Sequence, residues 1–146
     1  MNATESKDTV FVSGASSGIG MAVARRFARD GARLVVSARR EERLRALAAE
    51  LGGDVHVLPL DVRSREGVQA AVASLPEAFA DVSVLVNSAG LAAGLGPAQE
   101  ADLDDWDRMV DTNVRGLMYL TRALLPGMVR RLRGHVVNVG SVAGSY

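Results

Sequence analysis

A glycine-rich turn contains the residues best suited to chemistry in this sequence. It reads Ser13-Gly14-Ala15-Ser16-Ser17-Gly18-Ile19-Gly20, directly after a β-branched run and at the start of a helical pattern. Gly14 permits a sharp turn, Gly18 lets the backbone approach a pyrophosphate, and Gly20 lets the helix pack closely on the strand. A helix start also presents unpaired N–H groups and a positive dipole end to phosphates. The turn therefore predicts a dinucleotide site, although the same residues could form a tight strand-to-helix turn without a ligand.

Two arginines after the second predicted strand indicate which dinucleotide the site would prefer. A site for NAD usually has an acidic side chain at the end of this strand, where it binds the ribose hydroxyls. Here that position is Ala38, and Arg39 and Arg40 come next. A guanidinium suits a 2′-phosphate through paired, charge-assisted hydrogen bonds, so we expect NADP rather than NAD. The alternative is that both arginines are solvated charges, neutralised by Glu41 and Glu42 at the start of the next helix.

Short apolar strands and amphipathic helices must position these groups. Five β-branched runs, each bounded by glycine, proline or polar residues, are strand candidates at 9–13, 33–37, 55–60, 82–87 and 135–140. In the stretches between these strands, three sets of apolar residues have helical spacing: Ile19, Ala22, Val23 and Phe27; Leu44, Leu47, Ala48 and Leu51; Val68, Ala71, Val72 and Leu75. A longer fourth stripe, with Pro126 as a kink inside it, contains Trp106, Val110, Val114, Leu117, Thr121, Leu124 and Met128.

The alternation of strands and helices predicts the fold class. Continuous apolar strands joined by helical crossovers are typical of an α/β fold with a doubly wound, Rossmann-type parallel sheet. Gly31, Gly52 and Gly53 stand where helices need a left-handed C-terminal residue, and Ser64 is placed to cap the third helix. We expect one NAD(P)-binding domain over residues 1–146. Because the chain ends shortly after the fifth strand, we expect further strands and helices of this fold to be missing at the C-terminus.

Five motifs in a consistent order resemble the short-chain dehydrogenase/reductase family. The glycine-rich turn resembles the family's cofactor turn, Asp61-Val62 resembles the pair that holds the adenine ring, and Asn87-Ser88-Ala89-Gly90 resembles the family's N-N-A-G with serine in its second place. Asn113 matches the active-site asparagine, and Ser141 matches the catalytic serine. In open α/β sheets, ligands lie across the carboxyl ends of the strands, where these residues fall. Taken separately, Asn87 could merely end a strand, Asn113 could be a tolerated polar helix residue, and Ser141 could be a turn residue.

The resemblance implies hydride transfer between a nicotinamide and a hydroxyl or carbonyl carbon of a small-molecule substrate. Ser141 would hydrogen-bond the substrate oxygen, Asn113 would hold a water of the proton relay, and a Y-x-x-x-K pair would provide the acid/base tyrosine. Tyr146 follows Ser141 too closely and has no lysine after it. We therefore expect the chain as given to lack the catalytic tyrosine and lysine and to be inactive by itself. The alternative is a non-catalytic nucleotide-binding module or regulator.

Three stretches resemble one subgroup of this family in particular. Residues 85–91, 111–117 and 121–128 look most similar to the 3-hydroxy acid (serine-type) dehydrogenases of the family. We also expect the full-length protein to form a homo-oligomer. The candidate cofactor contacts are Gly14, Ala15, Ser16, Ser17, Gly18, Ile19, Gly20, Arg39, Arg40, Asp61, Val62, Asn87, Ala89 and Gly90.

The composition argues against several other functions. The 146 residues include 17 basic and 17 acidic side chains and no cysteine, so no overall field favours nucleic acid or membranes and no thiolate metal site is available. Arg130, Arg131 and Arg133 fall in the last turn of a helix, where cations complement the dipole. His56 and His135 have no further ligand at metal spacing, so we expect no metal. No secretory signal and no apolar run of ~20 residues is present, which predicts a cytoplasmic protein.

Overall fold

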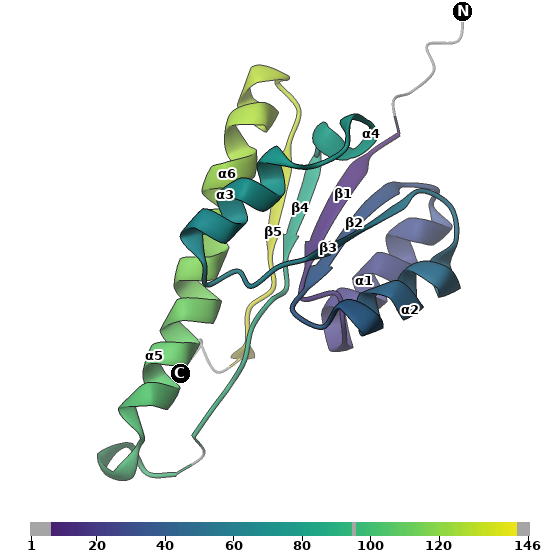
Figure 1. The fold of residues 1–146 in the computed structure, drawn as a ribbon. Coiled ribbons are helices and arrows are strands. Elements are labelled where there is room, and N and C mark those ends of the chain that lie inside the picture. Colours follow the sequence, from purple (N-terminus) through teal and green to yellow (C-terminus); the bar gives the residue numbers. More distant parts are fainter. Residues whose placement is uncertain (1–6, 95, 143–146) are drawn as a thin grey trace, which may run out of the picture.

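The computed structural model describes residues 7–94 and 96–142, which form a parallel sheet with helices on both faces (Figure 1). The strands lie in the order β3-β2-β1-β4-β5, so the chain crosses from one side of β1 to the other between β3 and β4. This confirms the doubly wound, Rossmann-type α/β fold. In chain order the elements are β1 (Thr9–Ser13), α1 (Gly18–Arg29), β2 (Arg33–Ala38), α2 (Glu41–Leu51), β3 (Val55–Pro59), α3 (Arg65–Ala73), α4 (Glu77–Ala80), β4 (Val84–Asn87), η1 (Ala98–Glu100), α5 (Leu103–Val110), η2 (Asp111–Gly116), α6 (Leu117–Arg130) and β5 (His135–Asn138).

Two apolar clusters, one on each face of the sheet, hold the helices in place. Val10 and Val12 of β1 point to the face covered by α1 and α2, where Leu44 is fully buried. Phe11 points to the opposite face, covered by α3 and α6, where Leu120 is fully buried. Because the central strands are buried on both faces, they read as continuous apolar runs rather than as an alternating pattern.

The predicted helix ends are confirmed. Gly31 and Gly52 have φ angles of 78° and 62°, in the left-handed region that favours glycine. The Ser64 hydroxyl accepts a hydrogen bond of 3.0 Å from the backbone N–H of Gly67 and so caps α3.

The stripe predicted for the first helix is wrong at two positions. Ile19 is 60% exposed and Ala22 is also exposed, whereas Gly20 and Ala24 are the buried residues of α1. The reason is the close approach of Gly20 to the preceding turn, which rotates this helix so that Ile19 faces the carboxyl ends of the strands. Val23 and Phe27 are half-buried, as a helix face at the edge of the core should be.

The long fourth helix does not carry a single continuous stripe as predicted. A π-helical segment, η2, separates α5 from α6, so the buried face of α6, formed by Leu120, Leu124 and Met128, is out of register with α5. Trp106, Val110 and Val114 are exposed, and α5 has no buried residue. Pro126 lies within α6, which continues to Arg130, so the proline does not end the helix. π-Helical turns inside α-helices are frequent at functional sites.

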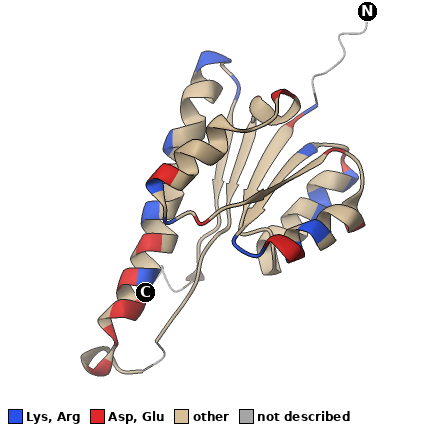
Figure 2. Ribbon diagram, viewed as in Figure 1, with Lys and Arg blue, Asp and Glu red and all other residues tan. Residues whose placement is uncertain are grey.

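Charge is distributed unevenly along this long helix. Figure 2 shows acidic side chains concentrated along α5 and basic side chains along the later part of α6.

β5 lies at the edge of the sheet beside β4, with most of its residues exposed. Within residues 7–94 and 96–142, no helix is long and apolar enough to cross a bilayer.

Candidate active site

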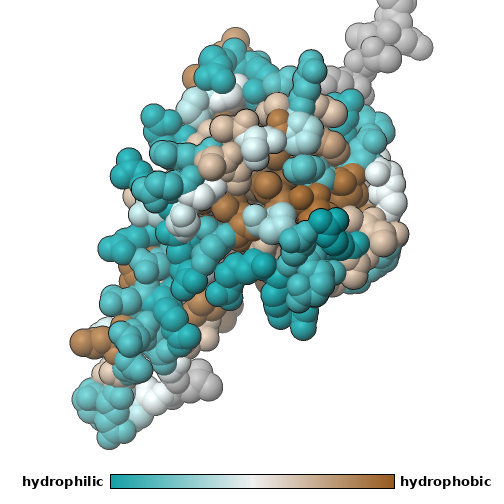
Figure 3. Space-filling view, in the orientation of Figure 1, coloured by the Kyte–Doolittle hydropathy of each residue, from teal (hydrophilic) through white to brown (hydrophobic). Residues whose placement is uncertain are grey.

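A cavity of about 760 Å³ lies across the carboxyl ends of the parallel strands. The surface is hollowed between the part of the molecule that carries α2 and the part that carries the long helix (Figure 3). Of the predicted site residues, Ala15 and Gly20 are buried behind the cavity, and all the others line it. Ten further residues line the cavity that were not among the candidate site residues: Ala38, Leu60, Ser88, Leu91, Ala92, Thr112, Leu117, Asn138, Val139 and Gly140.

Gly14 and Gly20 are required by close backbone approaches. Gly14 has a φ angle of 69°, and a Cβ added there would lie 2.7 Å from both the Ala89 nitrogen and the Ser88 oxygen. A Cβ on Gly20 would overlap the carbonyl oxygen of Gly14. The turn after β1 is therefore locked against the segment after β4, and the start of α1 is locked against the turn.

The start of α1 faces the cavity with unpaired backbone donors. Ser17, the N-cap residue, makes no side-chain capping hydrogen bond, and the first turn of α1 contains no acidic residue. Gly18 has a φ angle of 54°, and nothing lies within 4 Å of the place where its Cβ would be. The first N–H groups of α1 and the open space beside Gly18 fit a phosphate.

The Ser13 hydroxyl joins the ends of β1 and β4. It accepts hydrogen bonds from the backbone N–H groups of Ser88, at 3.1 Å, and Ala89, at 3.2 Å. Ser13 was not among the candidate site residues, although it begins the glycine-rich turn. Its position at the last residue of a buried strand could have indicated this role, because parallel strands end together at one edge of the sheet.

Arg39 and Arg40 border the cavity on the opposite side from β4, where Figure 2 shows basic residues in the β2–α2 connection. The Arg40 guanidinium donates a hydrogen bond of 3.3 Å to the Ser16 hydroxyl in the glycine-rich turn. Glu41 is paired with Arg45, with 2.8 Å between Nε and Oε1. In the described part of the chain no carboxylate pairs with Arg39 or Arg40, so the proposed neutralisation by the start of α2 is not observed.

Asp61 and Val62 form the cavity wall after β3. The guanidinium of Arg63 donates to both oxygens of the Asp61 carboxyl group, with 2.6 Å between Nη2 and Oδ2. This pairing holds the pKa of Asp61 below its ordinary value. Val62 is buried against Gly116 of η2, where a Cβ would lie 2.6 Å from Val62 Cγ2. The glycine lets the π-helical segment approach this wall.

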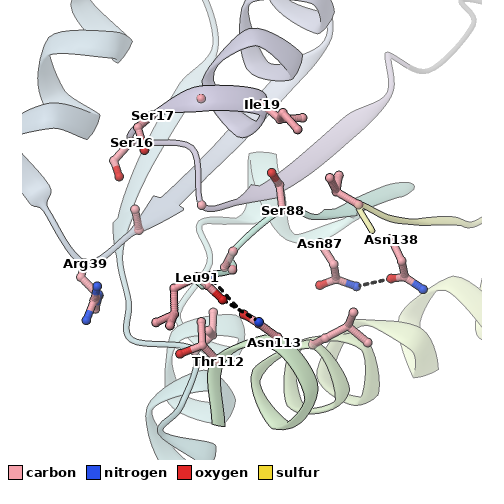
Figure 4. Close-up of a pocket in the computed structure, with 18 of the residues that line it drawn as sticks. Ser16, Ser17, Ile19, Arg39, Asn87, Ser88, Leu91, Thr112, Asn113 and Asn138 are labelled. Carbon is pink, nitrogen blue, oxygen red and sulfur yellow. Dashed lines mark hydrogen bonds between the residues drawn. The ribbon is translucent and has the colours of Figure 1, made fainter. Parts of the chain in front are cut away.

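Asn87 is a buried amide at the end of β4 that connects three elements. Its Nδ2 donates to the Thr121 hydroxyl of α6 at 3.0 Å. The same Nδ2 donates to Asn138 Oδ1 of β5 at 2.9 Å, a hydrogen bond drawn in Figure 4. Its Oδ1 is buried and has no hydrogen-bond partner among the described residues. Asn87 was a candidate site residue, whereas Asn138, the residue opposite it in the β4–β5 register, was not predicted.

Asn113 lies in the π-helical segment and holds the loop after β4. Its Oδ1 accepts from the backbone N–H of Leu91 at 2.9 Å, and its Nδ2 donates to the Leu91 carbonyl at 2.8 Å (Figure 4). The two hydrogen bonds fix the loop to η2 at the edge of the cavity. Gly90 is close by, since a Cβ there would lie 3.3 Å from Asn113 Oδ1.

Ser141 lines the cavity on the segment that follows β5 and is exposed. It therefore shares the cavity with Asn113, as the sequence analysis expected. Tyr146 lies outside the described residues. His56 and His135 are on β3 and β5, at opposite edges of the sheet. In the portion of the chain that the structure describes, no group of three or more His, Asp and Glu residues is placed to hold a metal ion.

The comparisons with known proteins agree with this geometry. The profile of the short chain dehydrogenase family matches residues 8–146. The chain is 53% identical over 137 residues to an NADP-dependent 3-hydroxy acid dehydrogenase, YdfG, of Salmonella typhi. The alignment covers 94% of this chain and 55% of that protein. It is 46% identical over 138 residues to a serine 3-dehydrogenase of Agrobacterium fabrum, with the same shares covered.

A solved structure shares the fold closely. The closed form of a serine dehydrogenase complexed with NADP+ superposes with a TM-score of 0.92 at 47% identity, over 94% of this chain and 55% of that one. The chain thus spans about half the length of the curated relatives that it matches. The match over nearly all of this sequence shows that the chain belongs to the short-chain dehydrogenase family.

Proposed function

We propose that the full-length protein is an NADP-dependent oxidoreductase that transfers a hydride between the nicotinamide and a hydroxyl or carbonyl carbon, with 3-hydroxy acids as its substrate class. The observation that carries the proposal is the cavity that brings the glycine-rich turn together with Arg39 and Arg40. The names of two similar proteins, an NADP-dependent 3-hydroxy acid dehydrogenase and a serine 3-dehydrogenase, support the cofactor and the substrate class. A cytoplasmic location and a homo-oligomeric state belong to the same proposal.

The residues around the cavity fit a dinucleotide that carries an additional phosphate. Gly18 leaves room for a pyrophosphate beside the uncapped start of α1. Arg39 and Arg40 border the part of the cavity next to the end of β2, where a 2′-phosphate would be placed by the topology of this fold. Asp61 and Val62, on the neighbouring strand end, would hold the adenine ring.

The other end of the cavity would hold the substrate. When bound, NADPH supplies the hydride. Ser141 would donate a hydrogen bond to the substrate oxygen, and Asn113 would hold the loop at Leu91 in place and support a proton relay. The tyrosine and lysine that the resemblance implies have no counterpart among the candidate residues of this chain, so we propose that residues 1–146 alone do not turn over substrate.

Steady-state kinetics on the full-length protein test the proposal. We expect oxidation of 3-hydroxy acids with NADP+, a much weaker reaction with NAD+, and no turnover by residues 1–146. A titration of the same two proteins with NADPH separates binding from catalysis. Tight NADPH binding by the full-length protein, without turnover of any 3-hydroxy or 3-oxo acid, would instead support a non-catalytic nucleotide-binding module.

A further inference from the structure

Arg63 fixes the Asp61 carboxyl group from one side. The backbone N–H of Arg63 donates to Asp61 Oδ1, with 3.0 Å between nitrogen and oxygen. The Arg63 Nε atom lies 3.0 Å from Oδ1 and 3.1 Å from Oδ2 and donates to both. The Nη2 group completes the arrangement at 2.6 Å from Oδ2. Three N–H groups on two carboxylate oxygens restrain rotation about the last side-chain bond of Asp61.

Asp61 keeps some acceptor capacity beside the hydrogen bonds from Arg63. A carboxylate offers about four acceptor sites, so the three donors of Arg63 leave about one for a ligand. Asp61 lines the cavity between Leu60 and Val62, whereas Arg63 does not line it. An ionised carboxylate can only accept, and the donor of an adenine ring is its 6-amino group.

Arg63 also lies close to the π-helical segment. The charge of Asp111, at the start of η2, contributes to raising the pKa of Arg63, after the larger effects of the hydrogen bond and charge of Asp61. The Asp111 carboxylate is itself paired with Arg115 at 2.6 Å. The guanidinium is therefore hydrogen-bonded to the carboxylate at the end of β3 and is affected more weakly by the charge of the carboxylate at the start of η2.

We propose that Arg63 is a positioning residue for cofactor recognition, which aims the Asp61 carboxylate at the adenine 6-amino group without itself touching the cofactor. The proposal rests on the proposed function, because it assumes that the cavity binds a dinucleotide. A purely structural ion pair is the competing explanation. Since both side chains are about one-third exposed, at 35% and 36%, such a pair would contribute little to folding.

A double-mutant cycle on the full-length protein tests this proposal. NADPH affinity is measured for wild type, Arg63→Gln, Asp61→Asn and the double variant, with melting temperatures as the check on folding. We expect Arg63→Gln to weaken NADPH binding about tenfold, Arg63→Lys to restore part of the loss, and the double variant to bind no more weakly than Asp61→Asn. Arg65→Gln is the matched control, because Arg65 is exposed on α3 and should leave the affinity unchanged.

A second ligand separates positioning from a general loss of positive charge. The hypoxanthine analogue of NADPH has a carbonyl in place of the 6-amino group, so wild type and Arg63→Gln should bind it with equal affinity. Equal losses for NADPH and for the analogue, or additive losses in the double variant, would overturn the role assigned to Arg63. Failure of the wild-type protein to bind NADPH would instead overturn the proposed function itself.

Discussion

The β1–α1 wall of the cavity is built from backbone, whereas the β4–β5 wall is built from amide side chains. On the first wall, Gly14 and Gly18 bring main-chain atoms to the cavity, Gly20 packs against the carbonyl of Gly14 behind them, and Ser17 provides no side-chain cap. On the second wall, the Asn87 amide connects β4 to β5 and α6. The Asn113 amide of η2 binds the loop that follows β4. A backbone wall tolerates no added atom at its close approaches, while a side-chain wall can lose one hydrogen bond and keep its shape.

The largest effect should come from adding a side chain to the backbone wall. Gly14→Val places a β-branched residue at a φ of 69° and against the backbone of Ser88 and Ala89, so we expect a loss of about 3 kcal/mol in the free energy of unfolding and no measurable NADPH binding. Chemical denaturation and cofactor titration measure the two effects.

Gly18→Ala sharpens this comparison, because its Cβ would meet no protein atom. We expect a cost of only about 1 kcal/mol from the positive φ, together with a large loss of NADPH affinity. Gly96→Ala is the control, since nothing lies within 4 Å of its Cβ position and both quantities should stay at their wild-type values. Unchanged NADPH binding by Gly18→Ala would show that the phosphates lie elsewhere.

The side-chain wall should affect turnover more than cofactor binding. Asn113→Ala removes both hydrogen bonds to Leu91 and frees the loop after β4. In the full-length protein we expect kcat to fall about 10²-fold and the Kd for NADPH to change by less than about threefold. Asp107→Ala, at an exposed position of α5, is the control. A parallel fall in cofactor affinity would mean that the two walls do not act separately.

The arginines should determine the choice between the two dinucleotides. Replacing Arg39 with Asp and Arg40 with Ala removes the cations beside the glycine-rich turn and adds an acceptor for ribose hydroxyls. We expect the ratio of NADPH to NADH affinity to fall about tenfold or more, because charge-assisted hydrogen bonds to a phosphate are lost. An unchanged ratio would show that these arginines are only solvated charges.

The smallest effect should be a pH dependence at Asp61. Arg63 and, more weakly, Arg39 lower the pKa of this carboxyl group, and the charge of Asp111 also acts on Arg63. A lowered folded-state pKa means that the stabilising charge is present above the ordinary pKa and is lost only as the pH falls through the lowered value. Wild-type NADPH affinity should therefore stay level down to the ordinary range of an aspartate. In Arg63→Gln it should decline at higher pH, and identical profiles would contradict this.

Much of the fold and site could be predicted because it depends on local patterns. β-Branched runs, the Ser64 cap and the glycine turn each need only a few neighbouring residues, and the structure places them as expected. The helix ends at Gly31 and Gly52 follow for the same reason. These features agree with one another, which is why the doubly wound parallel sheet could be predicted from the sequence.

The remaining features depend on contacts between distant segments. The π-helical segment η2 arises where Gly116 approaches Val62, and no periodicity in residues 103–130 alone predicts that shift. The exposure of Ile19 follows from the contact of Gly20 with the turn, which a helical spacing rule does not include. Asn138 was missed because its role depends on facing Asn87 across the β4–β5 register.

The central claim is that the cavity binds a phosphorylated dinucleotide through the glycine turn and the two arginines. The most direct test measures the Kd values of the wild-type full-length protein for NADPH and NADH in the same buffer. We predict that NADPH binds at least about tenfold more tightly, as the charge-assisted contacts of Arg39 and Arg40 with a 2′-phosphate require. Equal affinities for the two dinucleotides, or tighter binding of NADH, would contradict the account.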